Sequence, residues 1–96
     1  MPFPTADTLF KPLPGLVAKK IGPEYIIVPL RDHVADMDCL FTLNETGAFI
    51  WEQINGTRNV QDIAEAVHLE FEIDLPTALH DVQEVLAEME GKIIIR

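Results

Sequence analysis

The stretch LNETGAFIWEQINGTRNVQDIAEAVHLEF, residues 43–71, decides the fold because the apolar residues change to a helical period within it. Asn44 is a favourable N-cap for a short first helix, and Asn55-Gly56 supplies a left-handed stop. Asn59 can cap a second helix, whose apolar residues fall at i, i+3, i+4, i+7 and i+11: Val60, Ile63, Ala64, Val67 and Phe71. The stretch therefore predicts two consecutive amphipathic helices.

A third helix is predicted after Asp74, which is a suitable N-cap, with Pro76 in the first turn and Gly91 as the stop. Its apolar residues cover an arc wide enough to dock on one core: Leu75, Ala78, Leu79, Val82, Val85, Leu86 and Met89. The segment from Lys92 to Ile95 then predicts a final strand or wing.

Short runs rich in branched and aromatic residues precede the helices and predict strands at Leu16–Ile21, Tyr25–Leu30 and Cys39–Leu43. Gly22-Pro23 forms the first turn, and the second turn, residues 31–38, is longer and polar. The predicted order is β-β-β-α-α-α-β. This order corresponds to a small α+β, winged-helix-like domain in which helices pack on a short antiparallel sheet.

The length of 96 residues allows one hydrophobic core, because a domain of this size buries only about 60–68% of its unfolded surface. We expect residues 1–14, which carry Pro2 and Pro4, to form a flexible N-terminal arm, and residues 15–96 to form a single domain. The one cysteine, Cys39, excludes an internal disulfide and fits a reducing, cytoplasmic location. No apolar run approaches the ~20 residues of a membrane span.

The formal net charge is −9, and the acidic residues are concentrated in the helical half of the chain. Residues 44–91 contain eleven Asp or Glu residues and one base, Arg58. Such a surface repels phosphate backbones and anionic lipid, so we expect neither nucleic acid nor membrane as a partner.

Several short motifs in this order resemble the PqqD family and the wider group of leader-recognition domains named after it. They are an LN-x-[ST]-[GA] start to the first helix, a G-x-R turn, an IA pair and a DV pair in the last helix: Leu43, Asn44, Thr46, Gly47, Gly56, Arg58, Ile63, Ala64, Asp81 and Val82. The likeness is good from Leu43 to Ile95 and covers the preceding strands only in outline.

The resemblance implies a peptide chaperone that binds the N-terminal leader of a ribosomally made precursor peptide and presents it to a partner enzyme, commonly a radical SAM protein. In PqqD itself the peptide is the precursor of pyrroloquinoline quinone (PQQ). Members devoted to that cofactor usually join the second and third strands tightly, whereas this chain inserts RDHVADMD, residues 31–38. The general family is therefore better supported than PQQ biosynthesis.

A binding site can be predicted from strand geometry, because an edge strand leaves alternate N–H and C=O groups free to pair with an extended peptide. The third strand is the candidate edge, with Cys39, Leu40, Phe41 and Thr42. The family resemblance makes the last helix the other wall, where the candidates are Ala78, Asp81, Val82 and Val85. Val82 lies near the centre of the apolar arc and is at least as well explained as a core residue.

Other candidate sites have simpler explanations. A metal site or catalytic group built from Asp32, His33, Asp36, Asp38 and Cys39 matches no zinc spacing, and a solvated loop explains these residues better. His80 and Asp81 are helix neighbours that do not face each other, and His68 lies on a polar face. We therefore expect no catalytic residue, metal or cofactor.

Two alternatives to the leader-binding adaptor remain open at the level of the sequence. A winged-helix DNA-binding regulator would present a last helix without Lys or Arg to phosphates, which electrostatics disfavours. A PqqD-like accessory protein could instead serve another biosynthetic enzyme without any leader peptide. A homodimer is also open, because edge strands permit self-pairing.

Overall fold

The structure is a computed structural model that describes residues 3–31, 34–35 and 40–96. Its main sheet is antiparallel and has strand β3 (Glu24–Arg31) at its centre. Strand β2 (Leu16–Ile21) lies along one side of β3, with Leu16 opposite Pro29. On the other side, β5 (Phe41–Leu43) and the two-residue strand β4 (Val34–Ala35) pair with opposite ends of β3. The three predicted strands are confirmed with shifted ends, and β4 is an additional strand within the segment that was predicted as a polar turn, residues 31–38.

The three helices in the described part of the chain begin at the predicted caps: α1 (Glu45–Gln53), α2 (Val60–Phe71) and α3 (Leu75–Met89). The side chain of Asn44 accepts a hydrogen bond from the Gly47 N–H at 2.8 Å. Asn59 forms a capping box with Asp62, and Asp74 accepts from the Thr77 N–H. Gly56 and Gly91 both have positive φ angles; Gly91 directly follows the C-cap of α3, as predicted, whereas Gly56 lies two residues beyond Ile54, the C-cap of α1. The predicted helical half is confirmed.

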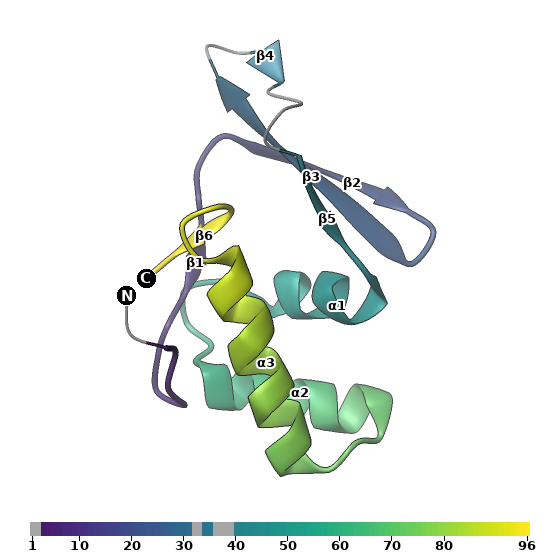
Figure 1. The fold of residues 1–96 in the computed structure, drawn as a ribbon, viewed down its shortest axis with the longest axis vertical. Coiled ribbons are helices and arrows are strands. Elements are labelled where there is room, and N and C mark those ends of the chain that lie inside the picture. The colour runs from purple at the N-terminus through teal and green to yellow at the C-terminus, as the bar shows by residue number, and fades with distance from the viewer. Residues whose placement is uncertain (1–2, 32–33, 36–39) are drawn as a thin grey trace.

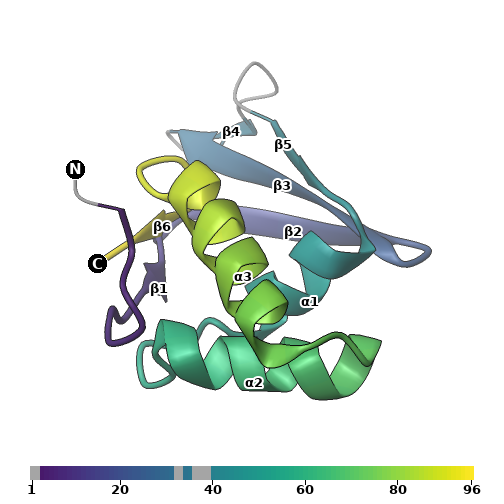
Figure 2. The same ribbon diagram turned by 60° about the horizontal axis from the view of Figure 1, so that its bottom comes forward.

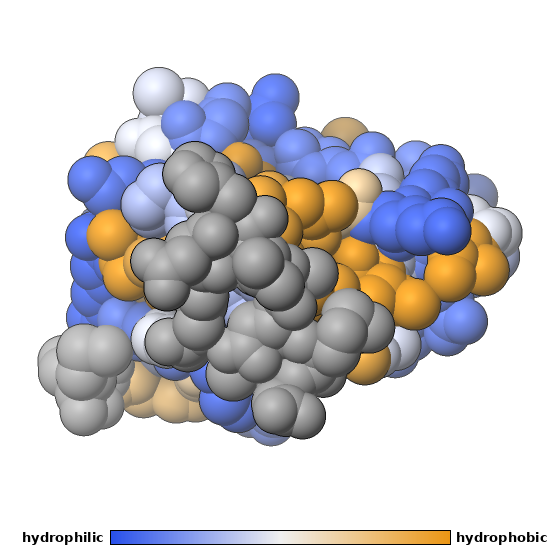
Figure 3. Space-filling model, turned by 90° about the horizontal axis from the view of Figure 1, so that it is seen from above, coloured by the Kyte–Doolittle hydropathy of each residue, from blue (hydrophilic) through white to orange (hydrophobic). Residues whose placement is uncertain are grey.

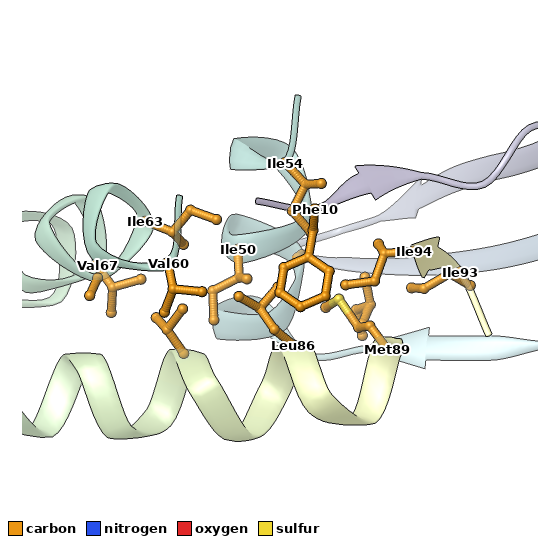
Figure 4. Close-up of a cluster of buried hydrophobic side chains, with 14 of the residues drawn as sticks. Phe10, Ile50, Ile54, Val60, Ile63, Val67, Leu86, Met89, Ile93 and Ile94 are labelled. Atoms are coloured by element: carbon orange, nitrogen blue, oxygen red, sulfur yellow. The ribbon is translucent and has the colours of Figure 1, made fainter. Parts of the chain in front are cut away.

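The core lies where the helices meet the sheet. Helix α3 packs against α2, and its C-terminal end points toward the sheet (Figures 1 and 2). Figure 4 shows Leu86 and Met89 of α3 gathered around the ring of Phe10, with Ile50 of α1 nearby. Ile27, at the centre of β3, is also fully buried. Together these residues form one continuous apolar cluster.

A small second sheet ties the two ends of the chain together. Strand β1 (Lys11–Pro12) pairs with β6 (Ile94–Ile95), beside the end of α3 (Figure 1). The final strand of the predicted wing is therefore confirmed in a shorter form. Its partner β1 was not predicted, because a two-residue strand containing proline gives no periodic signal.

We expected residues 1–14 to form a flexible arm separate from the domain. This expectation is wrong for residues 3–14, which pack against the domain. Phe10 is 1% exposed within the core, and Pro4 is fully buried. The Val60 N–H at the start of α2 donates to the Thr8 carbonyl at 3.1 Å, and the Gln83 amide of α3 donates to the Pro4 carbonyl. The carbonyl groups of this segment therefore accept hydrogen bonds from α2 and α3, and its side chains fill part of the core. The sequence pattern predicted neither role.

In the part of the chain that the structure describes, no helix has both the length and the apolar character needed to cross a membrane.

Candidate functional site

Strand β5 forms one edge of the main sheet. Among the described residues it pairs only with β3, in the register Tyr25 opposite Leu43 and Ile27 opposite Phe41. Alternate N–H and C=O groups of such an edge point away from the sheet and can accept a further strand. Side chains of a strand alternate between the two faces, so Phe41 and Leu43 share the face that carries the helices, while Thr42 is exposed.

A cavity of about 290 Å³ lies between this edge and the C-terminal half of α3. We call it the strand–helix groove. Helix α1 contributes to its end, because Asn44 caps that helix directly after β5. The groove is lined by Glu24, Phe41, Thr42, Leu43, Asn44, Gly47, Val85, Glu88 and Met89.

The structure brings some of the predicted site residues together in this groove. Phe41 and Thr42 from the edge strand and Val85 from α3 line it. Two other predicted residues lie near the groove but do not line it: Leu40, which is 40% exposed immediately before β5, and Asp81, which is half-buried one helical turn before Val85.

The other predicted residues lie elsewhere. Ala78 and Val82 have no exposed surface and belong to the core behind the groove. Core packing was the stated alternative for Val82, and its burial favours that interpretation. Cys39 lies outside the described residues.

Sequence reasoning did not single out five of the lining residues as part of the site: Glu24, Leu43, Asn44, Gly47 and Met89. Glu24 could have been found from the hairpin register, because it directly precedes Tyr25, which pairs with the last residue of β5. Met89 is fully buried and also borders the groove, and the helical pattern marked it only as a core residue. Nothing in the sequence alone distinguishes these two roles.

Two carboxylates line the groove, those of Glu24 and Glu88, and none of the described residues that line it is basic. Lys92 does not line the groove, but its ammonium lies 5.8 Å from the centre of the Phe41 ring.

Two groups outside the groove have shifted pKa values. Burial raises the pKa of the Tyr25 phenol, and the charge and hydrogen bond of Glu52 raise it further. Hydrogen bonds from the Thr77 hydroxyl and N–H lower the pKa of Asp74 below its usual value. Both shifts follow from local structural contacts, and neither marks an acid or base within the groove.

The remaining polar candidates have structural partners. His80 pairs with Glu84 at 2.7 Å on the exposed face of α3, and the His68 imidazole is hydrogen-bonded to the Ile73 carbonyl. The Arg58 guanidinium donates to the Gln53 carbonyl at the end of α1 at 3.3 Å. Across residues 3–31, 34–35 and 40–96, no group of three or more His, Cys, Asp or Glu side chains could hold a metal ion. Residues 32, 33, 36, 38 and 39 lie outside these ranges.

Two comparisons with known proteins found a matching family and a similar fold. The sequence model of the family described as "Coenzyme PQQ synthesis protein D (PqqD)" matches residues 24–95. Among solved structures, that of TbiB1 in complex with the TbiA(beta) leader peptide is similar, with a TM-score of 0.68 and 21% sequence identity. The match covers 86% of this chain and 93% of the TbiB1 chain, and it supports the fold. No curated protein matched the chain.

Proposed function

This chain belongs to the PqqD family, and from that premise we propose that it is a non-catalytic adaptor for a ribosomally made precursor peptide. It binds the leader of that peptide and presents it to a separate modifying enzyme of the cytoplasm, such as a radical SAM protein. The observation that carries the proposal is the groove beside an edge strand, which has the two walls that an extended peptide needs.

Binding in this proposal proceeds by strand addition. The leader pairs with the free side of β5, so that the backbone hydrogen bonds fix its register. Its side chains enter the strand–helix groove, where Phe41 and Val85 offer apolar contacts and Glu88 can meet a basic residue. The adaptor positions the peptide, and the partner enzyme performs the chemistry that leads to PQQ or to another peptide-derived product.

The comparison with TbiB1 supports the same choice of ligand. That protein shares the fold over most of both chains, and it was solved with a leader peptide bound. The acidic surface of α3 disfavours the DNA-binding alternative. A helix with no Lys or Arg from Leu75 to Met89 would be repelled by the phosphates of DNA.

The direct test is an amide-shift titration of the labelled protein with the leader of a short peptide encoded beside its gene. Shifts confined to residues 40–43 and 78–89 are expected. Val85→Asp should weaken binding at least tenfold, since it places a charge on the apolar wall of a groove. Leu69→Asp is the matched control, because Leu69 is 75% exposed on α2.

Melting curves of both variants separate loss of binding from loss of fold. If Val85→Asp is folded and binds with unchanged affinity, Val85 does not belong to the site. If the native protein shows no shifts at high peptide concentration, the leader-binding proposal fails. The PqqD-like accessory role without a leader would then be the function to pursue.

A further inference from the structure

The main sheet has a second edge, strand β2, on the opposite side of β3 from β5. Within the described part of the chain β2 pairs only with β3, along all six of its residues. Residues 17–21 are all exposed. A long exposed edge is a template for pairing with another chain. The leader site proposed above on β5 makes no use of this edge.

The register of β2 shows which of its backbone groups face the free side. The Leu30 N–H donates to the Gly15 carbonyl at 2.7 Å, so these two residues form a hydrogen-bonded pair. Bonded and non-bonded pairs alternate along an antiparallel ladder, so every second residue from Val17 onward is bonded to β3. The residues between them direct their N–H and C=O groups to the free side: Leu16, Ala18 and Lys20. These groups can pair with an added strand.

The side chains on one face of β2 are apolar and basic. Ile27 of β3 is fully buried in the core, so its partner Ala18 lies on the helix side of the sheet. The residues that alternate with Ala18 face away from the helices: Val17, Lys19 and Ile21. Val17 and Ile21 are 46% and 50% exposed, and Lys19 between them is exposed as well. An added strand would therefore meet an apolar, a basic and an apolar residue in turn.

These side chains adjoin further apolar residues on the same face of the sheet. Ile26 and Val28 of β3 lie opposite Lys19 and Val17 and are only half-buried. Figure 3 looks onto the molecule from the sheet side and shows apolar residues in a continuous area. Singly exposed apolar residues are ordinary, but several that adjoin one another indicate an interaction surface.

Lys19 determines the charge that this edge prefers in a partner. Its ammonium has no ion pair among the described residues. Opposite charges on directly opposed residues of neighbouring strands stabilise the pairing, and like charges destabilise it. An added strand with Asp or Glu opposite Lys19 is therefore favoured. Lys20 faces the other way and lines a small cavity with three carboxylates of the chain itself: Glu45, Glu52 and Glu70.

A second copy of the chain fits this edge poorly. Two β2 strands side by side would bring Lys19 and Lys20 of both copies onto one short ribbon. Lysine on an edge strand is a common protection against such self-pairing. The charge of the edge therefore favours a different chain, one that presents an acidic residue between two apolar ones.

We infer that the free edge of β2 is the docking site of the modifying enzyme, which adds an extended segment to the sheet there. At alternate positions this segment carries an apolar residue, Asp or Glu, and a second apolar residue, opposite Ile21, Lys19 and Val17. The pattern reads the same in both directions. The inference rests on the proposed function, because the occupant is the enzyme that the adaptor serves.

The sheet can hold the enzyme and the leader at the same time. β2 and β5 lie on opposite sides of β3, so an added strand on each edge leaves the other edge unobstructed. Neighbouring strands lie about 4.8 Å apart, so the leader backbone would run about 19 Å from the enzyme segment, across four strand spacings. The adaptor can therefore bind its enzyme without releasing the peptide.

The experiment is a calorimetric titration of the intact protein with the modifying enzyme encoded beside its gene. Ala18→Pro removes an outward N–H of β2 and no bond to β3, and proline is tolerated on an edge strand. This variant should bind the enzyme at least tenfold more weakly and the leader with less than a twofold change. Thr42→Pro is the matched control on β5. Thr42 lies opposite Ile26, which is bonded to β2, so its N–H also points outward, and its variant should lose the leader and keep the enzyme.

Lys19→Glu tests the charge without altering the backbone. It should weaken binding of the enzyme at least fivefold in dilute salt, because an attraction becomes a repulsion. The effect should be lost near 1 M salt, where the screening length falls to about 3 Å. Lys11→Glu, on the exposed strand β1, makes the same change in net charge and should alter the affinity by less than twofold. Melting curves check that each variant is folded, and Lys19→Glu decides the question if Ala18→Pro is not.

The outcomes separate the inference from the proposed function. If the leader binds but the enzyme does not, or if the enzyme binds folded Ala18→Pro and Lys19→Glu as tightly as the native protein, the inference is overturned and the leader-binding role stands. Dimers in sedimentation that Ala18→Pro dissociates would assign the edge to a second copy and also overturn it. If the enzyme binds through β2 and no leader binds, the proposed function fails and the docking site remains.

Discussion

Replacing Phe10 by Ala tests whether the N-terminal segment is part of the core. The ring is 1% exposed, lies among Leu86, Met89 and Ile94, and has the Arg96 guanidinium 5.6 Å from its centre. Truncating a fully buried Phe to Ala costs about 3–5 kcal/mol, because apolar contacts are lost and a cavity remains. A chain of this length has a free energy of unfolding of about 5–14 kcal/mol, so the substitution removes a large part of it.

Urea denaturation followed by circular dichroism measures this loss, and the melting temperature should fall by roughly 15–30 °C. Phe3→Ala is the matched control, since Phe3 belongs to the same segment and is 53% exposed. The control should change the free energy of unfolding by less than about 0.5 kcal/mol. A loss below about 1 kcal/mol for Phe10→Ala, or equal losses for the two variants, would refute the placement of the segment in the core.

Two further predictions concern the helix caps, and a third concerns the site. Asn59→Ala removes the acceptor of the capping box and should lower the free energy of unfolding by about 1 kcal/mol in urea denaturation; an unchanged midpoint would contradict this. Asp74 should titrate below 3.8 in carboxyl NMR spectra, because Thr77 hydrogen-bonds its ionised form. The stability that this bond contributes is present above pH 3.8 and is lost as the pH falls through the lowered pKa. Thr77→Val should bring the pKa back toward 3.8, and a pKa that does not move would exclude the hydroxyl as its cause. Val85→Asp should abolish the peptide-dependent amide shifts of residues 40–43, while the melting temperature stays within a few degrees. Shifts that are retained in this variant would contradict the groove as the peptide-binding site.

The helical half of the fold was predictable because each helix is specified by local signals. Asn44, Asn59 and Asp74 lie directly before apolar residues at helical spacing, and all of them cap helices in the structure. A cap acts within one turn, so the residues that decide it are neighbours in the sequence. The resemblance to the PqqD family rests on the same local motifs, and the family match confirms it.

The candidate site was predictable only in part. The edge strand and the last helix follow from element order, and these two elements do enclose the groove. Which residues of the helix face the groove depends on its rotation against the core. That rotation buries Val82 fully and leaves Val85 half-exposed, three residues later. The spacing of apolar residues predicts which side of a helix is apolar. It does not predict which edge of that apolar side stays uncovered when the helix packs against the sheet.

The sequence by itself determined the element order, the helix caps, the acidic character of the helical half and the family, because all of these depend on residue types and short spacings. Only the tertiary structure decided that Phe10 completes the core, that β1 pairs with β6, and that β5 and the C-terminal half of α3 line one groove. Each of these features joins segments that are distant in the chain. Such contacts depend on how whole helices and strands pack against one another, so no local period or motif in the sequence predicts them.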